Sequence, residues 1–325
     1  MSEVAAVILA AGRSTRMKSD LPKVLHEVCG RPMLAYVVDA CEQAGVGRVL
    51  LVVGHGKEKV VETFGDRGLC SFVEQAEQKG TGHAVLCCRE ALSGFAGRVL
   101  VIAADMPLVR GETLTRLLAE NTRTGHAITL ATTVLDEPAG YGRIVRDRAG
   151  DLLGIVEHND CTPEQREIHE VNPSYYCFDG RLMFEALGQV GNANAKGEYY
   201  ITDAVRILIE QGRGGGAIPA VPPEEAMGIN SRADLALVAR RMQDRIQAGW
   251  MAAGVTIVDP ASTWINAGAR IGPETVVYPF SYIDGRAGVG AGCRVGPFAC
   301  LLAGDVLADG QAVGPAEIIA GVSTS

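Results

Sequence analysis

The hydrophobic positions of the chain fall into two regions with different periods. Between residues 4 and 230, short apolar runs alternate with segments whose apolar positions recur at helical spacing. The runs at 4–10, 49–53 and 98–104 contain almost no polar residue, so each predicts a strand buried on both faces. Residues 32–41 have the helical spacing expected between such strands. This alternation predicts an α/β domain, with a mostly parallel sheet covered by helices on both faces.

From residue 265 onward the pattern changes to a repeat of six. An aliphatic residue recurs at every sixth position without a gap, and a small residue stands two positions before each of the middle members. An ordinary sheet alternates by two and does not produce this period. The repeat predicts a short triangular parallel β-helix, with aliphatic residues inside and small residues at the corners. The aliphatic positions are Ile265, Ile271, Val277, Ile283, Val289, Val295, Leu301, Leu307, Val313 and Ile319; the small ones are Ala269, Thr275, Ser281, Ala287, Cys293 and Ala299.

The two patterns predict three parts in the chain. A length of 325 residues suits two domains. We expect the first over residues 1–230 and the β-helix over 253–325, joined by a helix over 231–252. Ser231, followed three residues later by Asp234, is a signature of a helix N-terminus.

Composition and charge exclude several classes of protein. Hydrophobic residues make up 47% and charged residues 21%, which is ordinary for a globular protein. The net charge of −8, without a basic stripe, argues against a nucleic-acid partner. No apolar run approaches the roughly 20 residues of a membrane helix, and we expect no signal peptide, because the run at 4–11 is short and no basic segment precedes it. Nine cysteines without paired spacing indicate reduced thiols, so we predict a cytoplasmic protein.

The first strand is followed by a segment suited to binding phosphate. Residues 11–15 are small except for one arginine, so their backbone N–H groups can approach an anion closely. Arg16 and Lys23 bring two cations to the same rim. Neither a P-loop nor a Gly-x-Gly-x-x-Gly motif is present. An ordinary strand-to-helix turn would explain the glycine alone, but the added cations favour a nucleotide phosphate site.

A second loop, at residues 75–84, is suited to reading a base. Gln75 offers both a donor and an acceptor, as recognition of a pyrimidine edge requires. Gly80 and Thr81 would let the backbone come close to the base. The alternative is a plain polar loop in which Thr81 caps a helix. We expect His83 to be a packed helix residue rather than a ligand.

Two residues are candidate metal ligands. Asp105 follows the strand at 98–104, and a carboxylate at a strand end suits a Mg²⁺ ion carried on substrate phosphates. An aspartate that caps the helix near Gly111 is the weaker alternative, because that helix starts several residues later. Asn230 stands just before the linking helix and could give the metal a neutral oxygen.

These motifs together resemble a known family. Leu9-Ala10-Ala11-Gly12-Arg13-Ser14-Thr15-Arg16-Met17, followed by Pro22-Lys23, resembles the signature L-A-A-G-x-G-T-R-M…P-K of sugar-nucleotide pyrophosphorylases. Residues 19–26 make it similar to the bacterial bifunctional N-acetylglucosamine-1-phosphate uridylyltransferase/glucosamine-1-phosphate acetyltransferase family. The family's Q-x-x-x-x-G-T, G-Y-G-R-I, G-I-V-E, E-x-N and G-E-Y-Y-I-T-D motifs follow in order, from Gln75 to Asp203.

The resemblance implies a fold, a reaction and a set of site residues. The fold is a Rossmann-like nucleotidyltransferase followed by a left-handed parallel β-helix. UTP and N-acetylglucosamine 1-phosphate give UDP-N-acetylglucosamine, a cell-wall precursor, and pyrophosphate, by in-line attack on the α-phosphorus. Arg16 and Lys23 stabilise the triphosphate, and Asp105 and Asn230 hold Mg²⁺. The implied nucleotide contacts are Leu9, Ala10, Ala11, Gly12, Gln75, Gly80 and Thr81; the implied sugar contacts are Gly140, Glu157, Asn172 and Asn230.

The sequence departs from the family pattern in three places. Ser14 replaces the second glycine of the signature, and Ala103-Ala104 replace a Tyr-Gly pair, which leaves the exact sugar open. The family's acetyltransferase domain is far longer than residues 253–325. No histidine follows His169 and no lysine follows Lys196, whereas acetyl transfer to an amine requires a base. We therefore expect no acetyltransferase activity.

Assembly and two rival functions complete the prediction. The resemblance implies a homotrimer formed through the β-helix, to which outward aromatic residues could contribute. One rival is a nucleotidyltransferase for another sugar 1-phosphate or nucleotide. The other is a catalytically silent scaffold, against which the retained Arg16, Lys23, Asp105 and Asn230 speak. The candidate assembly residues are Trp264, Tyr278, Phe280, Tyr282 and Phe298.

Overall fold

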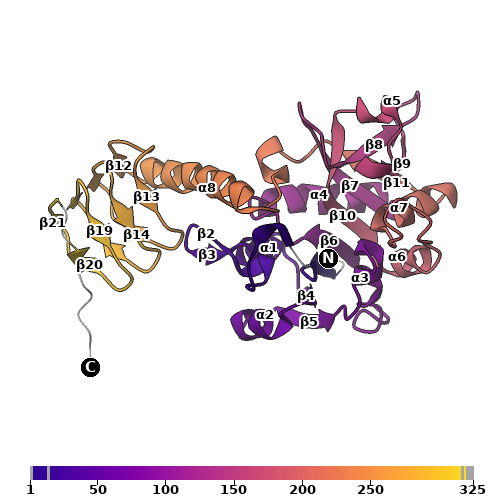
Figure 1. Ribbon diagram of the computed structural model, residues 1–325, viewed down its shortest axis with the longest axis horizontal. Helices are drawn as coiled ribbons and strands as arrows, with labels where there is room; N and C mark the ends of the chain where they lie inside the picture. Colours follow the sequence, from indigo (N-terminus) through magenta and orange to yellow (C-terminus); the bar gives the residue numbers. More distant parts are fainter. Residues whose placement is uncertain (1–2, 13–14, 316–317, 320–325) are drawn as a thin grey trace. The chain divides into compact units, whose positions relative to one another are not determined.

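The protein is described from a computed structural model, which defines residues 3–12, 15–315 and 318–319. Within these ranges the chain folds into two compact units, each described by itself (Figure 1). The first contains the chain up to His26 and Met33–Asn230. The second contains Glu27–Pro32 and the chain from Ser231 onward. Residues 27–32, which we expected in the first domain, therefore belong to the second unit.

The first unit is built on a nine-stranded sheet. Its main path runs in the order β11-β7-β10-β6-β1-β4-β5, and β8 and β9 form an antiparallel extension from β10. The half that contains β6, β1, β4 and β5 is parallel throughout, as predicted, whereas β10 runs antiparallel to β6 and β7. The strands are β1 (Val4–Leu9), β4 (Arg48–Val53), β5 (Cys70–Glu74), β6 (Arg98–Ala103), β7 (Ile128–Val134), β8 (Gly142–Arg146), β9 (Leu152–Val156), β10 (Glu170–Asp179) and β11 (Gly215–Ile218).

Helices cover both faces of this sheet, which explains why β1 is apolar throughout and why β4 and β6 are apolar after their first residue, an arginine. Ala6 and Ile8 of β1 pack in a core cluster with α1, α2 and α4, whereas Ala5 and Val7 pack in a second cluster with α3, α6 and α7. The helices are α1 (Met33–Gln43), α2 (Lys57–Phe64), α3 (Thr81–Leu86), α4 (Gly111–Thr124), α5 (Pro163–Arg166), α6 (Gly180–Leu187) and α7 (Ile201–Glu210). No helix among the described residues has the length and hydrophobicity needed to cross a membrane.

Within the described ranges, four short 3₁₀ turns connect these elements. Two of them, η1 and η2, follow β1 and contain the two predicted catalytic residues: Arg16 lies in η1 and Lys23 lies in η2. The turns are η1 (Thr15–Met17), η2 (Lys23–Leu25), η3 (His158–Asp160) and η4 (Pro223–Ala226).

The second unit begins with the long helix α8 (Arg232–Ala252). Its start is a capping box: the Ser231 hydroxyl accepts from the Asp234 N–H, and the Asp234 carboxylate accepts from the Ser231 N–H. This confirms the helix start predicted from the sequence. Further along, the buried side chains of Gln243 and Gln247 donate to the carbonyls of Ile265 and Thr263, which joins α8 to the repeat region.

The repeat region is a parallel β-helix with three faces, as predicted (Figure 1). Each strand has two residues and, from Trp264 onward, pairs with the strand that starts eighteen residues later, as Trp264 does with Tyr282. The first strand is offset by two further residues, because Thr256 pairs with Val276. The strands are β12 (Thr256–Ile257), β13 (Trp264–Ile265), β14 (Arg270–Ile271), β15 (Val276–Val277), β16 (Tyr282–Ile283), β17 (Gly288–Val289), β18 (Arg294–Val295), β19 (Cys300–Leu301), β20 (Val306–Leu307), β21 (Ala312–Val313) and β22 (Ile318–Ile319).

Side-chain burial follows the period of six. Every predicted aliphatic position from Ile265 to Val313 is buried, and so is every predicted small residue from Ala269 to Ala299. The side chain of Ile319 lies outside the described residues. Each small residue immediately precedes a strand, where the chain turns from one face to the next. The aliphatic positions and the small positions of the predicted repeat are therefore both buried, as the sequence predicts.

A hairpin from the N-terminal part of the chain completes the second unit. It consists of β2 (Glu27–Val28) and β3 (Arg31–Pro32). The Ala267 N–H donates to the Cys29 carbonyl, and the Gln243 side chain donates to the Cys29 sulfur at 3.3 Å. Burial raises the pKa of the Cys29 thiol to about 11. Gly30 has a φ of +79° and lies against Asn266, where a Cβ would be 2.7 Å from the amide nitrogen. The hairpin is thus a close-fitting part of this unit.

Candidate active site

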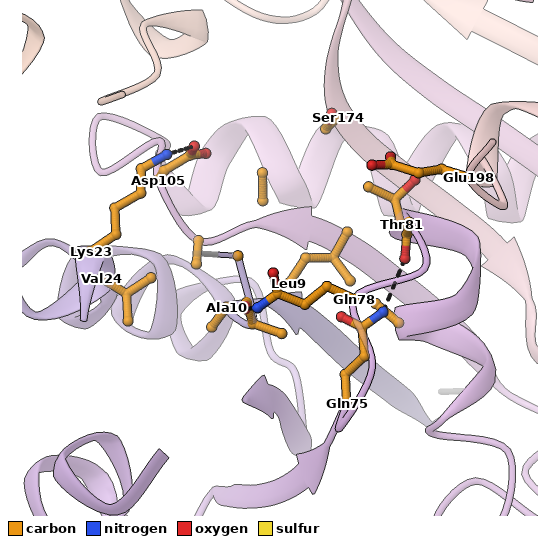
Figure 2. Close-up of a pocket in the computed structure, with 16 residues that line it drawn as sticks. Leu9, Ala10, Lys23, Val24, Gln75, Gln78, Thr81, Asp105, Ser174 and Glu198 are labelled. Carbon is orange, nitrogen blue, oxygen red and sulfur yellow. Dashed lines mark hydrogen bonds and ion pairs between the residues drawn. The ribbon is translucent and has the colours of Figure 1, made fainter. Parts of the chain in front are cut away.

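A cavity of about 370 Å³ lies beyond the carboxyl ends of β1, β5 and β6 (Figure 2). This is the edge at which ligands bind in open parallel sheets. Nine of the predicted site residues line it: Leu9, Ala10, Ala11, Gly12, Lys23, Gln75, Gly80, Thr81 and Asp105. Gln78, Ser174 and Glu198 line the cavity as well and were not selected from the sequence.

The phosphate-binding segment begins directly where β1 ends. The Ala10 N–H donates to the Val52 carbonyl, so the strand geometry extends one residue beyond Leu9. The Gln78 side chain donates to the Ala11 carbonyl at 2.6 Å and so joins the segment to the loop after β5. Arg13 and Ser14 lie outside the described residues, and the effect of Ser14 stays a prediction.

Four predicted catalytic and metal-binding side chains meet at one place. The Lys23 Nζ lies 2.5 Å from Asp105 Oδ2 and 2.9 Å from Asn230 Oδ1. The Arg16 Nη2 lies 2.9 Å from the same Asn230 oxygen. The Ile229 N–H donates to the backbone carbonyl of Asp105, which fixes the segment before Asn230 to the end of β6. Residues far apart in the sequence therefore form one charged cluster.

The geometry of this cluster suits a hard cation. One carboxylate oxygen and one amide oxygen converge on the Lys23 ammonium, which occupies the position of a cation between them. Oxygen donors of these two types are the ligands that Mg²⁺ prefers. No group of three or more His, Cys, Asp or Glu side chains that could hold a metal occurs among the described residues. A Mg²⁺ ion here would therefore take further ligands from substrate phosphates and water, as it commonly does.

The loop after β5 places Gln75 at the floor of the cavity. Its side chain is almost fully buried, and its Nε2 donates to the Gly80 carbonyl at 3.1 Å. His83, which we expected only to pack in a helix, lies with Nδ1 3.0 Å from the same Nε2. The N-cap of α3 is Gly80, not Thr81, and the Thr81 hydroxyl accepts from the Ile201 N–H. The alternative in which Thr81 caps α3 is therefore wrong.

Gly80 occupies a position that only glycine fits well. Its φ is +107°, and a Cβ there would lie 2.6 Å from the Tyr199 carbonyl oxygen. The neighbouring backbone is hydrogen-bonded to the same segment, since Tyr199 N–H donates to the Lys79 carbonyl and Gly82 N–H donates to the Tyr199 carbonyl. This packing also brings Glu198 to the rim of the cavity.

Three of the four predicted sugar-binding residues form a separate group around the start of β8, whereas the fourth, Asn230, lies in the cluster with Lys23. Asn172 pairs with Gly142, and a Cβ on Gly142 would lie 3.6 Å from Glu157 Oε2. Gly140 precedes this strand in a left-handed conformation. None of Gly140, Glu157 and Asn172 lines the cavity that contains Asp105. Glu157 lines a second cavity instead, together with Tyr200, Thr202 and Asp203.

Two residues of this group, Glu157 and Asn172, form side-chain hydrogen bonds within the protein. The Thr202 hydroxyl donates to Glu157 Oε1 at 3.1 Å, and burial raises the pKa of the Glu157 carboxyl. The Asn172 Nδ2 donates to the Tyr176 hydroxyl, and its Oδ1 accepts from the Ser174 N–H. The Asn172 amide therefore has a partner at each end within β10, which the sequence did not indicate.

The two alanines that depart from the family pattern, Ala103 and Ala104, line the first cavity beside Asp105.

The chain matches one family of domains and is similar to several bacterial proteins. Residues 6–169 match the family of MobA-like NTP transferase domains. The bifunctional protein GlmU of Geobacter metallireducens is 47% identical over 295 residues, which are 91% of this chain and 62% of that protein. GlmU of Geotalea daltonii is 44% identical over 91% of this chain and 65% of its own length. GlmU of Pelobacter propionicus is 44% identical over 97% of this chain and 72% of its own length. The chain thus spans less than two-thirds of the length of the first two relatives and 72% of the third.

Solved structures share the fold of the chain. UDP-glucose pyrophosphorylase complexed with UDP-glucose superposes with a TM-score of 0.61 at 19% identity, covering 75% of this chain and all of that one. The apo form of UDP-glucose pyrophosphorylase gives a TM-score of 0.62 over 76% of this chain. At this identity the likeness shows the fold alone.

Proposed function

Since the chain belongs to the GlmU family of nucleotidyltransferases, we propose that it transfers a uridylyl group from UTP to a sugar 1-phosphate. The preferred sugar is N-acetylglucosamine 1-phosphate, and the products are UDP-N-acetylglucosamine and pyrophosphate. The observation that carries this proposal is the convergence of Lys23, Asp105 and Asn230 beside a cavity at the carboxyl ends of β1 and β6.

The charges of the cluster fit this reaction. An oxygen of the sugar phosphate attacks the α-phosphorus of UTP, and the bond from the α-phosphorus to the bridging oxygen of the pyrophosphate breaks. Arg16 and Lys23 supply positive charge where the leaving pyrophosphate gains negative charge. A general base is not needed, because the attacking phosphate is already ionised.

Mg²⁺ is the cofactor that we propose for this site. Asp105 and Asn230 would hold it, because their oxygens already converge on one cationic atom. When bound, the ion neutralises phosphate charge and polarises the phosphoryl oxygens. In the described state the Lys23 ammonium is paired with Asp105 and Asn230, so a bound Mg²⁺ would take its place between these oxygens and leave the ammonium to pair with phosphate.

A substrate panel tests the proposed reaction. The full chain is incubated with UTP, CTP, ATP or GTP and with the 1-phosphates of N-acetylglucosamine, glucosamine, glucose or galactose, while pyrophosphate release is followed. We expect UTP with N-acetylglucosamine 1-phosphate to give the highest kcat/KM. A different best sugar would favour the rival specificity that Ala103 and Ala104 motivate. No release with any pair would favour a silent scaffold.

Glu157 provides a prediction that separates sugar binding from stability. Burial raises the pKa of the Glu157 carboxyl, so ionisation of this group lowers the free energy of unfolding. The loss of stability grows as pH rises from the usual glutamate pKa of about 4.3 through the raised value. Glu157→Gln should therefore raise the Tm at pH 7 and leave it little changed at pH 4. The same variant should lose about tenfold or more in kcat/KM for the sugar phosphate, because a charged hydrogen bond is lost.

Calorimetry and kinetics on the same preparation check this prediction. Glu185→Gln, on the exposed face of α6, is the matched control and should change neither quantity. A lower Tm at pH 7 for Glu157→Gln, or an unchanged kcat/KM, would contradict the role given to this carboxylate.

The expected lack of acetyl transfer gives a further prediction. Residues 253–325 contain neither histidine nor lysine, so this chain offers there no imidazole base and no ammonium group for coenzyme A phosphates. Incubation of the full chain with acetyl-coenzyme A and glucosamine 1-phosphate should release no free thiol above background. Steady thiol release at a rate comparable to uridylyl transfer would show that the expectation is wrong.

We also propose that the β-helix assembles the protein into a homotrimer. Of the five aromatic residues suggested by the sequence, Phe280 and Phe298 are the exposed pair: they are 58% and 57% exposed, and their rings stack with centroids 4.9 Å apart. Tyr278 and Tyr282 are half-buried and accept hydrogen bonds from Arg294 and Asn266. Trp264 donates to Asn266.

Light scattering on the full chain tests this assembly. We expect a trimer at micromolar concentration, and a shift toward monomer in the double variant Phe280→Ser/Phe298→Ser, because the exposed apolar surface is lost. A wild-type protein that is monomeric at this concentration would contradict the proposal.

A further inference from the structure

We propose that His83 sets the pyrimidine selectivity of the nucleotide site by holding the amide of Gln75 in one orientation. This inference rests on the proposed function, because it concerns the nucleotide of that reaction. His83 acts through Gln75 and is therefore a positioning residue.

The backbone of Gln75 is fixed by the sheet. Its N–H donates to the Val53 carbonyl at 2.8 Å, which continues the pairing of β5 with β4. The side chain is 4% exposed and lines the cavity that contains Asp105. Gln75 thus presents an amide to the cavity from a rigid position (Figure 2).

Two acceptors determine which way the amide faces. The Gly80 carbonyl can only accept a hydrogen bond, so the Gln75 atom 3.1 Å away must be the nitrogen, Nε2. An amide nitrogen carries two protons, and the second is directed at His83 Nδ1, 3.0 Å away. His83 must then accept at Nδ1 and carry its own proton on Nε2. Both amide protons are then satisfied. Turning the amide would place its oxygen against the Gly80 carbonyl and would require His83 to move its proton to Nδ1.

The remaining atom of the amide is the one that a base would meet. Gln75 Oε1 accepts no hydrogen bond from the described part of the chain, and it lies on the side of the amide opposite the contact with Gly80 (Figure 2). A nearly buried side chain therefore offers the cavity a hydrogen-bond acceptor and no donor. An acceptor at this place pairs with the N3–H of uracil. Cytosine has a lone pair at N3, which the same oxygen would repel.

His83 is itself held in place by the packing of α3. The first turn of that helix is fixed to the segment before α7, because the Thr81 hydroxyl accepts from the Ile201 N–H and the Gly82 N–H donates to the Tyr199 carbonyl. Removing the His83 acceptor leaves one amide proton of a buried group unpaired, which is costly, and the amide then keeps one of the two contacts that hold its orientation, so rotation becomes easier. In the rotated state the nitrogen would face the base and could donate to N3 of cytosine.

The test measures binding of UTP and of CTP by calorimetry, without added sugar phosphate. We expect the wild-type chain to bind UTP at least about tenfold more tightly than CTP, because a mismatched buried hydrogen bond costs at least that factor. His83→Phe, which keeps a flat ring but lacks the acceptor, should reduce this ratio to within about threefold. His83→Asn places an amide oxygen near the Nδ1 position and should restore most of it.

Two controls keep structural damage separate from selectivity. His169→Phe removes an exposed imidazole from the same unit and should leave the ratio unchanged. Thermal unfolding of each variant reports whether the unit still folds, and His83→Leu, which also lacks the acceptor, carries the test if His83→Phe does not fold. A loss of affinity for both nucleotides by the same factor would indicate a merely structural role and would overturn the inference.

The inference and the proposed reaction can fail separately. A UTP to CTP ratio that His83→Phe leaves unchanged overturns the inference, and so does a wild-type chain without preference between the two nucleotides. Neither result concerns the transfer reaction, which the pyrophosphate assay measures independently. A chain that prefers UTP but releases no pyrophosphate with any sugar phosphate overturns the proposed reaction alone.

Discussion

Asp105→Asn is expected to reduce turnover by about a thousandfold or more while the protein keeps its fold. The variant removes the one carboxylate that the described residues bring to Lys23 Nζ, and with it the charge that would hold Mg²⁺ on the substrate phosphates. Asparagine has nearly the same shape, so the packing at the end of β6 should be preserved. Initial rates of pyrophosphate release over a range of Mg²⁺ concentrations measure the effect.

The matched control for this variant is Asp151→Asn, which removes an exposed carboxylate near the start of β9. It should leave both the rate and the Mg²⁺ dependence unchanged. If Asp105→Asn turns over at a near-normal rate with an unchanged Mg²⁺ dependence, Asp105 is not the metal ligand, and the cluster around Lys23 has another role.

Lys23→Met should lower kcat by roughly a hundredfold to a thousandfold with a smaller change in KM. Methionine has a similar length but no charge, so the variant removes the cation that faces Asp105 and Asn230. We place its main contribution at the leaving pyrophosphate, where charge builds up during the reaction, so the loss should fall mainly on kcat.

Lys23→Arg distinguishes charge from position in this prediction. The guanidinium keeps the positive charge but cannot place a single nitrogen between the two oxygens, so we expect an intermediate kcat. Full activity in Lys23→Met, with unchanged KM for UTP, would remove the lysine from the proposed mechanism.

Local pattern was enough to predict most of the fold. The strands β1, β4 and β6 are buried on both faces, so their sequences are apolar except for the arginine that begins β4 and β6, and they are easily recognised. The β-helix was predictable because each of its strands obeys the same local rule, with an aliphatic residue inside and a small residue before it. The hairpin of β2 and β3 has six residues and no period, so its membership in the second unit depends on contacts far away in sequence.

The sequence predicted the site residues that belong to a motif. It did not predict those whose place in the site depends on tertiary packing. Lys23, Asp105 and Asn230 were selected from their places after strands and before helices, and the structure brings them together. Ser174 was missed because it reaches the cavity through an irregularity in β10, where the register shifts between Val171 and Tyr175. Gln78 was missed because its place depends on a hydrogen bond to the Ala11 carbonyl, which no local sequence pattern predicts.

The central claim is that this chain transfers a uridylyl group to a sugar 1-phosphate, and the most direct test follows the α-phosphate. UTP labelled at its α-phosphate is incubated with the full chain, Mg²⁺ and N-acetylglucosamine 1-phosphate, and the products are separated by ion-exchange chromatography. We predict that the label moves into UDP-N-acetylglucosamine and that an equal amount of unlabelled pyrophosphate forms, only when the sugar phosphate is present. Label that stays in UTP, or appears in UMP or UDP without a sugar nucleotide, would contradict the proposed transfer.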